Sequence, residues 1–176
     1  MKVILDAPIL TQSGYGEHSR LVFRALQQIE GVDIYINPLN WGKTGWISDD
    51  TEELQRIEDG IKNMATAIRN SKNTNQDIDF DLQVQVGIPS EFVKKAPYSI
   101  CVTAGIESDR ISPEWVMQTH KGIDKIIVPS NHAAKGFKET SFEVSDEANN
   151  LKTILSCNDI PISVVPYPVK MFNNAK

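Results

Sequence analysis

The sequence predicts an α/β fold: a Rossmann-like, doubly wound and mostly parallel sheet of about six strands with helices on both faces. Two observations lead to this prediction. Short apolar segments rich in β-branched residues recur along the chain, and between them lie longer segments whose apolar residues follow helical spacing. Strands that alternate with helices are typical of βαβ crossovers, which place successive strands parallel in one sheet.

The length and composition limit what this fold can be. A chain of 176 residues is the size of one domain, so we expect a single Rossmann-like domain over residues 1–176. Its 40% hydrophobic and 23% charged residues are typical of globular proteins. The formal net charge of −5, without a cluster of lysines and arginines, argues against a nucleic-acid partner.

The amino-terminal apolar run is short and is interrupted by Asp6 and Pro8, which fits neither a signal peptide nor a membrane span. We therefore expect a cytoplasmic protein without a transmembrane segment. Its two cysteines are expected to be reduced thiols, Cys101 as a small core residue and Cys157 in a polar loop region. The three histidines show no metal-ligand spacing, so we expect no metal.

The first half of the chain is expected to hold three strands and two helices. The strands are placed at 2–9, 33–36 and 80–88, and the third, with Gln83 and Gln85 alternating with apolar residues, is expected to be less buried than its neighbours. The first helix is placed at about 17–30, with Gly31 in the left-handed position that ends it. The second helix follows the glycine- and tryptophan-rich loop 37–48 and opens with the capping box Asp50-x-x-Glu53. Its apolar stripe consists of Leu54, Ile57, Ile61, Met64 and Ile68, and a polar connection begins at residue 70.

The second half is expected to continue the alternation. We place a helical turn at 90–96, strands at 98–103, 124–129 and 162–165, and helices at 113–122 and from Ser130 to about residue 139. Pro113 in the first turn, Ser112 as cap and Gly122 at the end support the first of these helices. The acidic and polar segment 141–159 is expected to contain a short helix near 147–156.

The stretch 103–115, TAGIESDRISPEW, follows an apolar strand and carries Glu107, Asp109 and Arg110 at its carboxyl end. In open α/β sheets this edge binds ligands. A carboxylate there can accept a proton or hold sugar hydroxyls, while Arg110 can meet an anion. The structural alternative is that the three charged residues pair with one another and fix the loop.

The first loop, Ser13-Gly14-Tyr15-Gly16, lies between the first strand and the first helix, where Rossmann-like folds bind phosphate. It is not a dinucleotide fingerprint, because Ser19 occupies the third glycine position of G-x-G-x-x-G, and no Gly-Lys-Ser/Thr follows it. The alternative is a tight turn whose glycines only supply positive φ angles.

Three neighbouring residues extend this loop. Tyr15 either covers a ligand or packs, and His18 and Arg20 either reach the same cleft or are surface residues. At the end of the 124–129 strand, Ser130 is expected to cap a helix. Asn131 and His132 then point toward the same edge, either as functional groups or as solvated side chains.

These residues carry a resemblance. Residues 87–137 resemble the amino-terminal half of glycosyltransferases with two Rossmann domains (the GT-B architecture), closest to the retaining group 1 family that uses nucleotide sugars. The family's T-x-x-x-E-x-x-R-x-P-x-x-W pattern is resembled by Thr103, Glu107, Arg110 and Trp115, with Pro113 one position later than the proline of the pattern. Its D-x-I-x-V-P-S-x-x-x-x-x-x-F pattern is matched by Asp124, Ile126, Val128, Pro129, Ser130 and Phe137. The S-G-Y-G loop resembles the family's glycine-rich first loop, and the closing V-V-P-Y-P-V resembles the strand before the interdomain crossing.

The resemblance implies an acceptor-binding glycosyltransferase domain, with a nucleotide sugar such as a UDP- or GDP-sugar as donor, a carbohydrate or other acceptor, and no cofactor. It implies Glu107 as the catalytic residue. The donor phosphates would lie near Ser13, Gly14, Tyr15, Gly16 and His18. The acceptor would be bound by Glu107, Asp109, Arg110, Asn131 and His132.

The chain departs from the family in three respects. Members run to about twice this length, with a second domain that holds most donor contacts and an E-x(7)-E pair, and segment 141–159 is longer than the usual connection. We therefore expect the domain to require a donor-domain partner or to form a homo-oligomer. Two alternatives remain: a non-catalytic carbohydrate- or nucleotide-binding module, and a remnant used as a protein-interaction domain, which exposed apolar groups around Tyr167 and Met171 would favour.

Overall fold

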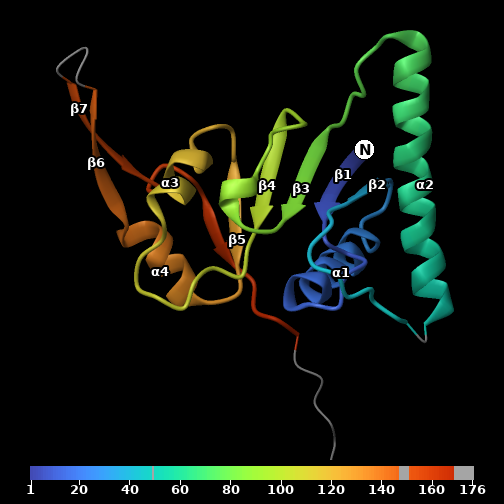
Figure 1. Cartoon of the computed structure of the whole chain (residues 1–176), viewed down its shortest axis with the longest axis horizontal. Helices are drawn as coiled ribbons and strands as arrows, with labels where there is room; N and C mark the ends of the chain where they lie inside the picture. Colours follow the sequence, from blue (N-terminus) through green and yellow to red (C-terminus); the bar gives the residue numbers. More distant parts are fainter. Residues whose placement is uncertain (49, 147–150, 169–176) are drawn as a thin grey trace, which may run out of the picture.

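The computed structural model describes residues 1–48, 50–146 and 151–168. It has one six-stranded parallel sheet with helices packed around it, which confirms the predicted α/β, Rossmann-like fold (Figure 1). The strand order is β2-β1-β3-β4-β5-β8. The strands of this sheet are β1 (Lys2–Ala7), β2 (Asp33–Pro38), β3 (Leu82–Val86), β4 (Tyr98–Val102), β5 (Lys125–Val128) and β8 (Ile162–Val164).

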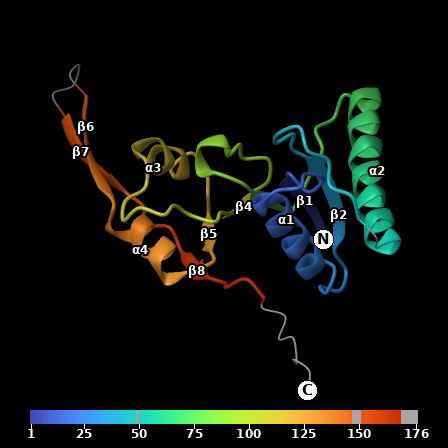
Figure 2. The ribbon, with the colours of Figure 1, turned by 60° about the horizontal axis from the view of Figure 1, so that its bottom comes forward.

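The helices divide between the two faces of the sheet. They are α1 (Gly14–Leu26), α2 (Thr51–Thr74), α3 (Pro113–Thr119) and α4 (Asn131–Glu139), with a single 3₁₀ turn, η1 (Pro89–Glu91). Because side chains alternate along a strand, Val3, Leu5 and Ala7 of β1 all face α1 and pack with Phe23 and Leu26. The opposite face of the sheet carries α3 and α4, which Figure 2 shows well separated from α1.

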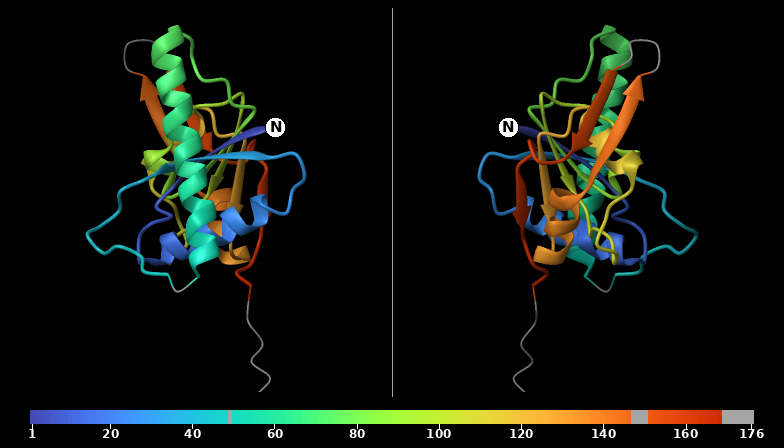
Figure 3. Two further views of the ribbon diagram at one scale, coloured as in Figure 1. Left: turned by 90° about the vertical axis from the view of Figure 1, so that its right-hand side faces the viewer. Right: turned by 90° about the vertical axis from the view of Figure 1, so that its left-hand side faces the viewer.

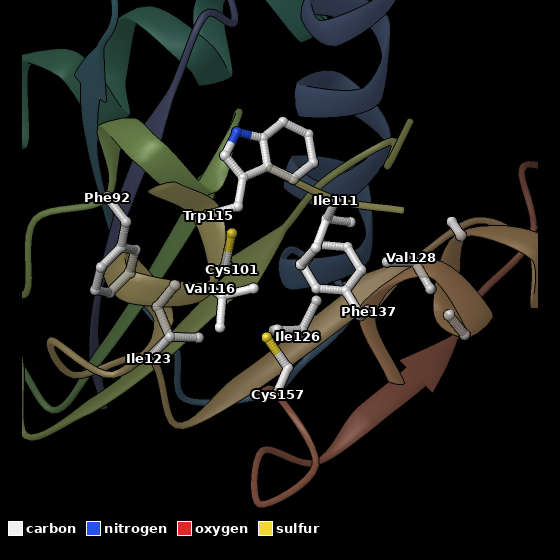
Figure 4. Close-up of a cluster of buried hydrophobic side chains, with 12 residues drawn as sticks. Phe92, Cys101, Ile111, Trp115, Val116, Ile123, Ile126, Val128, Phe137 and Cys157 are labelled. Carbon is white, nitrogen blue, oxygen red and sulfur yellow. The ribbon is translucent and has the colours of Figure 1, made fainter. Parts of the chain in front are cut away.

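Under α3 and α4 lies an apolar core cluster (Figure 4). Its largest side chains are Trp115 and Phe137, whose rings stack with centroids 6.1 Å apart. They cover Cys101 of β4 and Ile126 of β5, which are paired in the sheet register. Cys157 is completely buried in the same cluster. Cys157 does lie in a loop, the one after β7, as predicted, but its side chain is buried against the core and Thr119 of α3.

The long helix α2 stands along the edge of the sheet formed by β2 (Figures 1 and 3). Its Gly60 lies so close to Ile36 that a Cβ on it would be 2.6 Å from the Ile36 Cδ1 atom. Asp50 caps the helix as predicted, accepting from the N–H of Glu53 at 2.9 Å. The buried Glu53 side chain, however, accepts from Arg24 Nε of α1 at 2.6 Å, so its carboxylate joins two helices.

The third strand is more buried than the sequence predicted. Gln83 and Gln85 are 0% and 4% exposed, because η1 and the segment after it cover them. Their side chains bond the backbone of that segment: Gln83 Nε2 donates to Val93 O at 2.7 Å, and Gln83 Oε1 accepts from Lys95 N at 2.8 Å. The polar alternation in β3 therefore marks a buried hydrogen-bonded layer in a central strand, not a solvated face.

Other differences concern the ends of helices. Helix α1 begins at Gly14, earlier than expected, because Ser13 is its N-cap and accepts from Gly16 N at 3.0 Å. It also ends earlier, at Leu26, and Gly31 with φ of 72° belongs to the turns that follow. Helix α2 continues to Thr74 into the expected connection and ends at Asn75, whose φ is 54°.

The segment 141–159 was predicted wrongly. Instead of a short helix near 147–156, it contains an antiparallel pair, β6 (Ser141–Asp146) and β7 (Leu151–Ser156), that extends away from the sheet (Figure 1). Residues 147–150 of that expected helix lie outside the described residues. The physical reason is tertiary: Phe142 and Leu155 are opposite each other in the register and both pack against the core under α3 and α4. A short apolar run does not by itself distinguish helix from strand.

Among the described residues, no helix has both the length and the apolar composition that crossing a membrane requires.

Both cysteines are expected to be unreactive in the folded chain. Burial raises the pKa of Cys101 to about 12 and also raises the pKa of Cys157, so little thiolate exists at neutral pH. With a colorimetric disulfide reagent at pH 7.5, we expect no fast-reacting thiol in the native protein and both thiols after denaturation. A thiol that reacts at the rate of a free peptide cysteine would contradict the burial described above.

Candidate functional site

The strand order creates a switch point between β1 and β3. The connection after β1 leads to α1 on one face, and the connection after β3 leads through η1 to the other face, where Gln83 and Gln85 bond it. At such a point the two connections separate at the carboxyl ends of the strands, where open α/β sheets bind ligands. The first turn of α1 lies at this position.

The two glycines of the first loop have different roles. A Cβ on Gly14 would meet no atom within 4 Å, so this residue faces open space at the helix start. A Cβ on Gly16 would lie 2.0 Å from the Thr11 carbonyl oxygen, so only glycine fits there. Neither is among the residues with positive φ, so the alternative of a tight turn built on positive φ angles is wrong. The N–H groups of a helix's first turn have no intrahelical acceptor; here the N–H of Gly16 donates to the Ser13 side chain, and Gly14 is exposed.

Tyr15 joins the first turn of α1 to the end of β4. Its hydroxyl lies 3.1 Å from Thr103 Oγ1 and accepts from the backbone N–H of Ala104 at 3.3 Å. Its ring meets Trp41 edge-on at 4.8 Å, and Trp41 lies against Gly87 at the end of β3. Tyr15 is therefore half-buried: its ring packs against Trp41, and its hydroxyl lies at the carboxyl edge of the sheet.

His18 and Arg20, expected near the same cleft, are buried. The His18 ring meets Tyr167 edge-on at 4.8 Å, and its Nδ1 atom lies 3.3 Å from the Tyr167 hydroxyl. Burial lowers the pKa of His18, which favours the neutral imidazole. Arg20 is 3% exposed and donates to the carbonyls of Ile9 and Thr11 at 2.8 and 3.1 Å. Arg20 therefore holds the first loop in place and is not open to a ligand.

The loop after β4 presents its charged side chains to solvent. Glu107, Asp109 and Arg110 are exposed, and none of them forms an ion pair with another described residue. The mutual pairing considered as the structural alternative is therefore not seen. The loop is held instead by its backbone: Gly105, with φ of 80°, lies so close to Ala133 of α4 that a Cβ on it would be 2.6 Å from the Ala133 Cβ.

The start of α4 lies beside this loop. Ser130 caps α4 as predicted, accepting from Ala133 N at 3.1 Å. Asn131 and His132 are exposed in the first turn, adjacent to the Ala133 that packs on Gly105. The carboxyl edge thus brings together three of the predicted groups, which are the open start of α1, the charged loop after β4 and the start of α4. His18 lies behind this edge.

Sequence reasoning did not assign Trp41 to the site, and it named Tyr167 only as an exposed apolar group for protein interaction. With Tyr15 and His18 they form a row of rings in which each ring lies within 6.5 Å of the next. The tryptophan-rich loop 37–48 was one available signal, because large aromatic residues in loops at this edge often contact ligands. Within the described ranges, no group of three or more His, Cys, Asp or Glu side chains is arranged to hold a metal ion.

Replacing the two glycines by alanine tests their different roles. We expect Gly16→Ala to lower the free energy of unfolding by about 1–3 kcal/mol, because its Cβ forces the Thr11 backbone to move. Gly14→Ala is the matched control and is expected to change it by less than about 1 kcal/mol. Urea denaturation followed by circular dichroism measures both. Equal losses in the two variants would show that the close approach to Thr11 does not decide the residue at position 16.

Comparison of the chain with known proteins adds no relative. Searches found no significant match to a protein-family model, to a curated protein or to a solved structure. The fold assignment therefore depends on the sheet order and the packing, and the site on its own geometry.

Proposed function

We propose that this chain is the acceptor-binding, amino-terminal domain of a glycosyltransferase that uses a nucleotide sugar and requires a donor-binding domain or partner for turnover. The observation that carries the proposal is the gathering of groups at one edge of the sheet. An exposed helix start, suited to a phosphate, lies at the switch point beside a loop whose exposed carboxylates have no ion-pair partner among the described residues.

The chemistry of these groups fits the two substrates of such a reaction. Exposed carboxylates and amides, here Glu107, Asp109 and Asn131, accept or donate hydrogen bonds to sugar hydroxyls. The helix start near Gly14 supplies N–H donors for the donor's phosphates. The aromatic row from Trp41 to Tyr167 offers ring faces and edges to a sugar or a base.

The same edge supplies few cations for a leaving nucleotide. Arg20 donates to backbone carbonyls and is not open to a ligand. Arg110, in the loop after β4, is exposed. Transfer of a glycosyl group leaves a negatively charged nucleotide, which requires positive groups arranged around it. This is why a donor-binding partner is part of the proposal.

A second candidate function is a protein-interaction domain. Val165 and Tyr167, at the end of the described chain, are 54% and 43% exposed. Met171, also named for this alternative, lies outside the described residues. Exposed apolar side chains favour association with another protein or a second copy. A stable oligomer without saccharide binding would favour this candidate.

Calorimetric titration of the purified chain with a panel of saccharides and with UDP-, GDP- and ADP-sugars tests the proposal. We expect saccharide binding that Glu107→Ala weakens by about 10-fold or more, since a hydrogen bond to a charged group contributes about 1.5–3 kcal/mol. Glu58→Ala, at an equally exposed glutamate on α2, is the control and should bind as the wild type does.

Two results would contradict the proposal in different parts. Wild-type affinity of Glu107→Ala for every saccharide would remove Glu107 from the site. Sustained product formation from a nucleotide sugar by the chain alone would show that no donor-binding partner is needed.

A further inference from the structure

The face of the sheet that carries α1 is only partly covered. Beside α1 lies a groove of about 440 Å³. Its floor is formed by apolar side chains of three neighbouring strands, Leu82, Val84, Ile100, Val102 and Ile127. One wall is α1, and the residues after β8, 165–168, bound it as well. An all-parallel sheet normally has both faces covered, and within residues 1–48, 50–146 and 151–168 nothing fills this groove.

The lining is almost entirely apolar. Among the lining residues only His18 and Tyr167 have polar side chains, and these lie together, 3.3 Å apart. His18 directly follows the first turn of α1, so this polar pair marks the end of the groove nearest the carboxyl edge of the sheet. At the other end, in the turns after α1, lies Ile29, which is 50% exposed. The groove therefore has one polar end and one long apolar wall.

These features favour an alkyl chain over a protein segment as the occupant. An extended peptide brings backbone N–H and C=O groups, for which the apolar floor and the α1 wall offer no side-chain partners. An α-helix is about 10–12 Å across, whereas a hollow of about 440 Å³ is in the size range of small-molecule sites. An alkyl chain has no hydrogen bonds to satisfy, and beside α1 from His18 to Leu26 it would have roughly 12 Å of apolar wall.

The polar end of the groove opens toward the candidate site. The rings of His18 and Tyr15 lie 6.5 Å apart near the start of α1, and the Tyr15 hydroxyl reaches the loop after β4. We propose that the groove binds the apolar tail of an amphiphilic acceptor whose polar head lies at the carboxyl edge near Gly14 and Tyr15. Calling this amphiphile an acceptor rests on the proposed function, whereas its binding to the groove does not.

The test uses a series of n-alkyl glucosides, hexyl to dodecyl, titrated into the full chain below their micelle concentrations and without a nucleotide sugar. We expect the dissociation constant to fall by about two- to fourfold for each added methylene until the tail fills the groove. Ala25→Glu, on α1, and Ile29→Glu, in the turns after it, place a charge in the lining of the groove at exposed positions, and each should abolish the dependence on chain length. The matched control is Val93→Glu, at a 61% exposed valine on the opposite face, which should retain it.

Three outcomes would overturn the inference. The first is an affinity that does not depend on the length of the alkyl chain. The second is loss of this dependence in Val93→Glu as well. The third is a wild-type dimer in sedimentation that Ile29→Glu dissociates, which would make a second copy of the chain the occupant. Because no donor is present, failure here leaves saccharide binding at Glu107 untouched. Conversely, the chain could bind alkyl glucosides in proportion to tail length while Glu107→Ala changed the affinity for no saccharide. That result would support the groove as an alkyl-chain site and contradict the proposed function.

Discussion

The position of β1 between β2 and β3 is the constraint on which the rest of the structure depends. Crossovers between parallel strands are right-handed, so the direction in which the chain moves along the sheet decides which face its helix covers. The chain moves from β1 to β2 in one direction and from β2 past β1 to β3 in the other. The first helix therefore lies on one face and the later helices lie on the other. The connections after β3, β4 and β5 all proceed in the same direction and cover the second face. This one reversal produces both the switch point at the carboxyl edge and the face that α1 covers alone.

At the carboxyl edge of the sheet, well-held backbone lies beneath exposed polar side chains. Arg20 holds the backbone of the first loop through two carbonyls and stacks on Trp46 at 4.3 Å, and Gly16 fits against Thr11. The Tyr15 hydroxyl fixes the first turn of α1 to the end of β4. By contrast, the carboxylates of the loop after β4 have no partner among the described residues. Rigid support beneath unpaired polar groups is the arrangement that binding sites require, since the support limits the entropy lost when a ligand is bound.

Much of the fold could be predicted because its signals are local. Apolar strands, the caps Ser112 and Ser130 and the periodicity of α2 depend on neighbouring residues, and each occurs as expected. Apart from the helix ends, the main failures involve distant partners. The glutamines of β3 look solvated in sequence but bond the backbone after η1, the apolar run before Cys157 pairs with β6, and Arg20 finds carbonyls nine and eleven residues away. For the site, spacing located the loops correctly but could not tell which side chains are buried, so His18 was placed in the cleft although it lies behind it.

The first turn of α1 is where the two proposed binding regions meet, and its chemistry suits both. On one side the N–H groups near Gly14 carry the positive end of the helix dipole and face solvent. On the other side His18 faces the apolar groove, where burial lowers its pKa and keeps the imidazole neutral. A protonated His18 would place a charge in an apolar groove and would add a cation beside a helix start. A neutral ring avoids both, and its contact with the Tyr167 hydroxyl gives the polar atoms at this end of the groove a partner. Residues 14–18 thus separate the exposed start of α1 from an apolar groove.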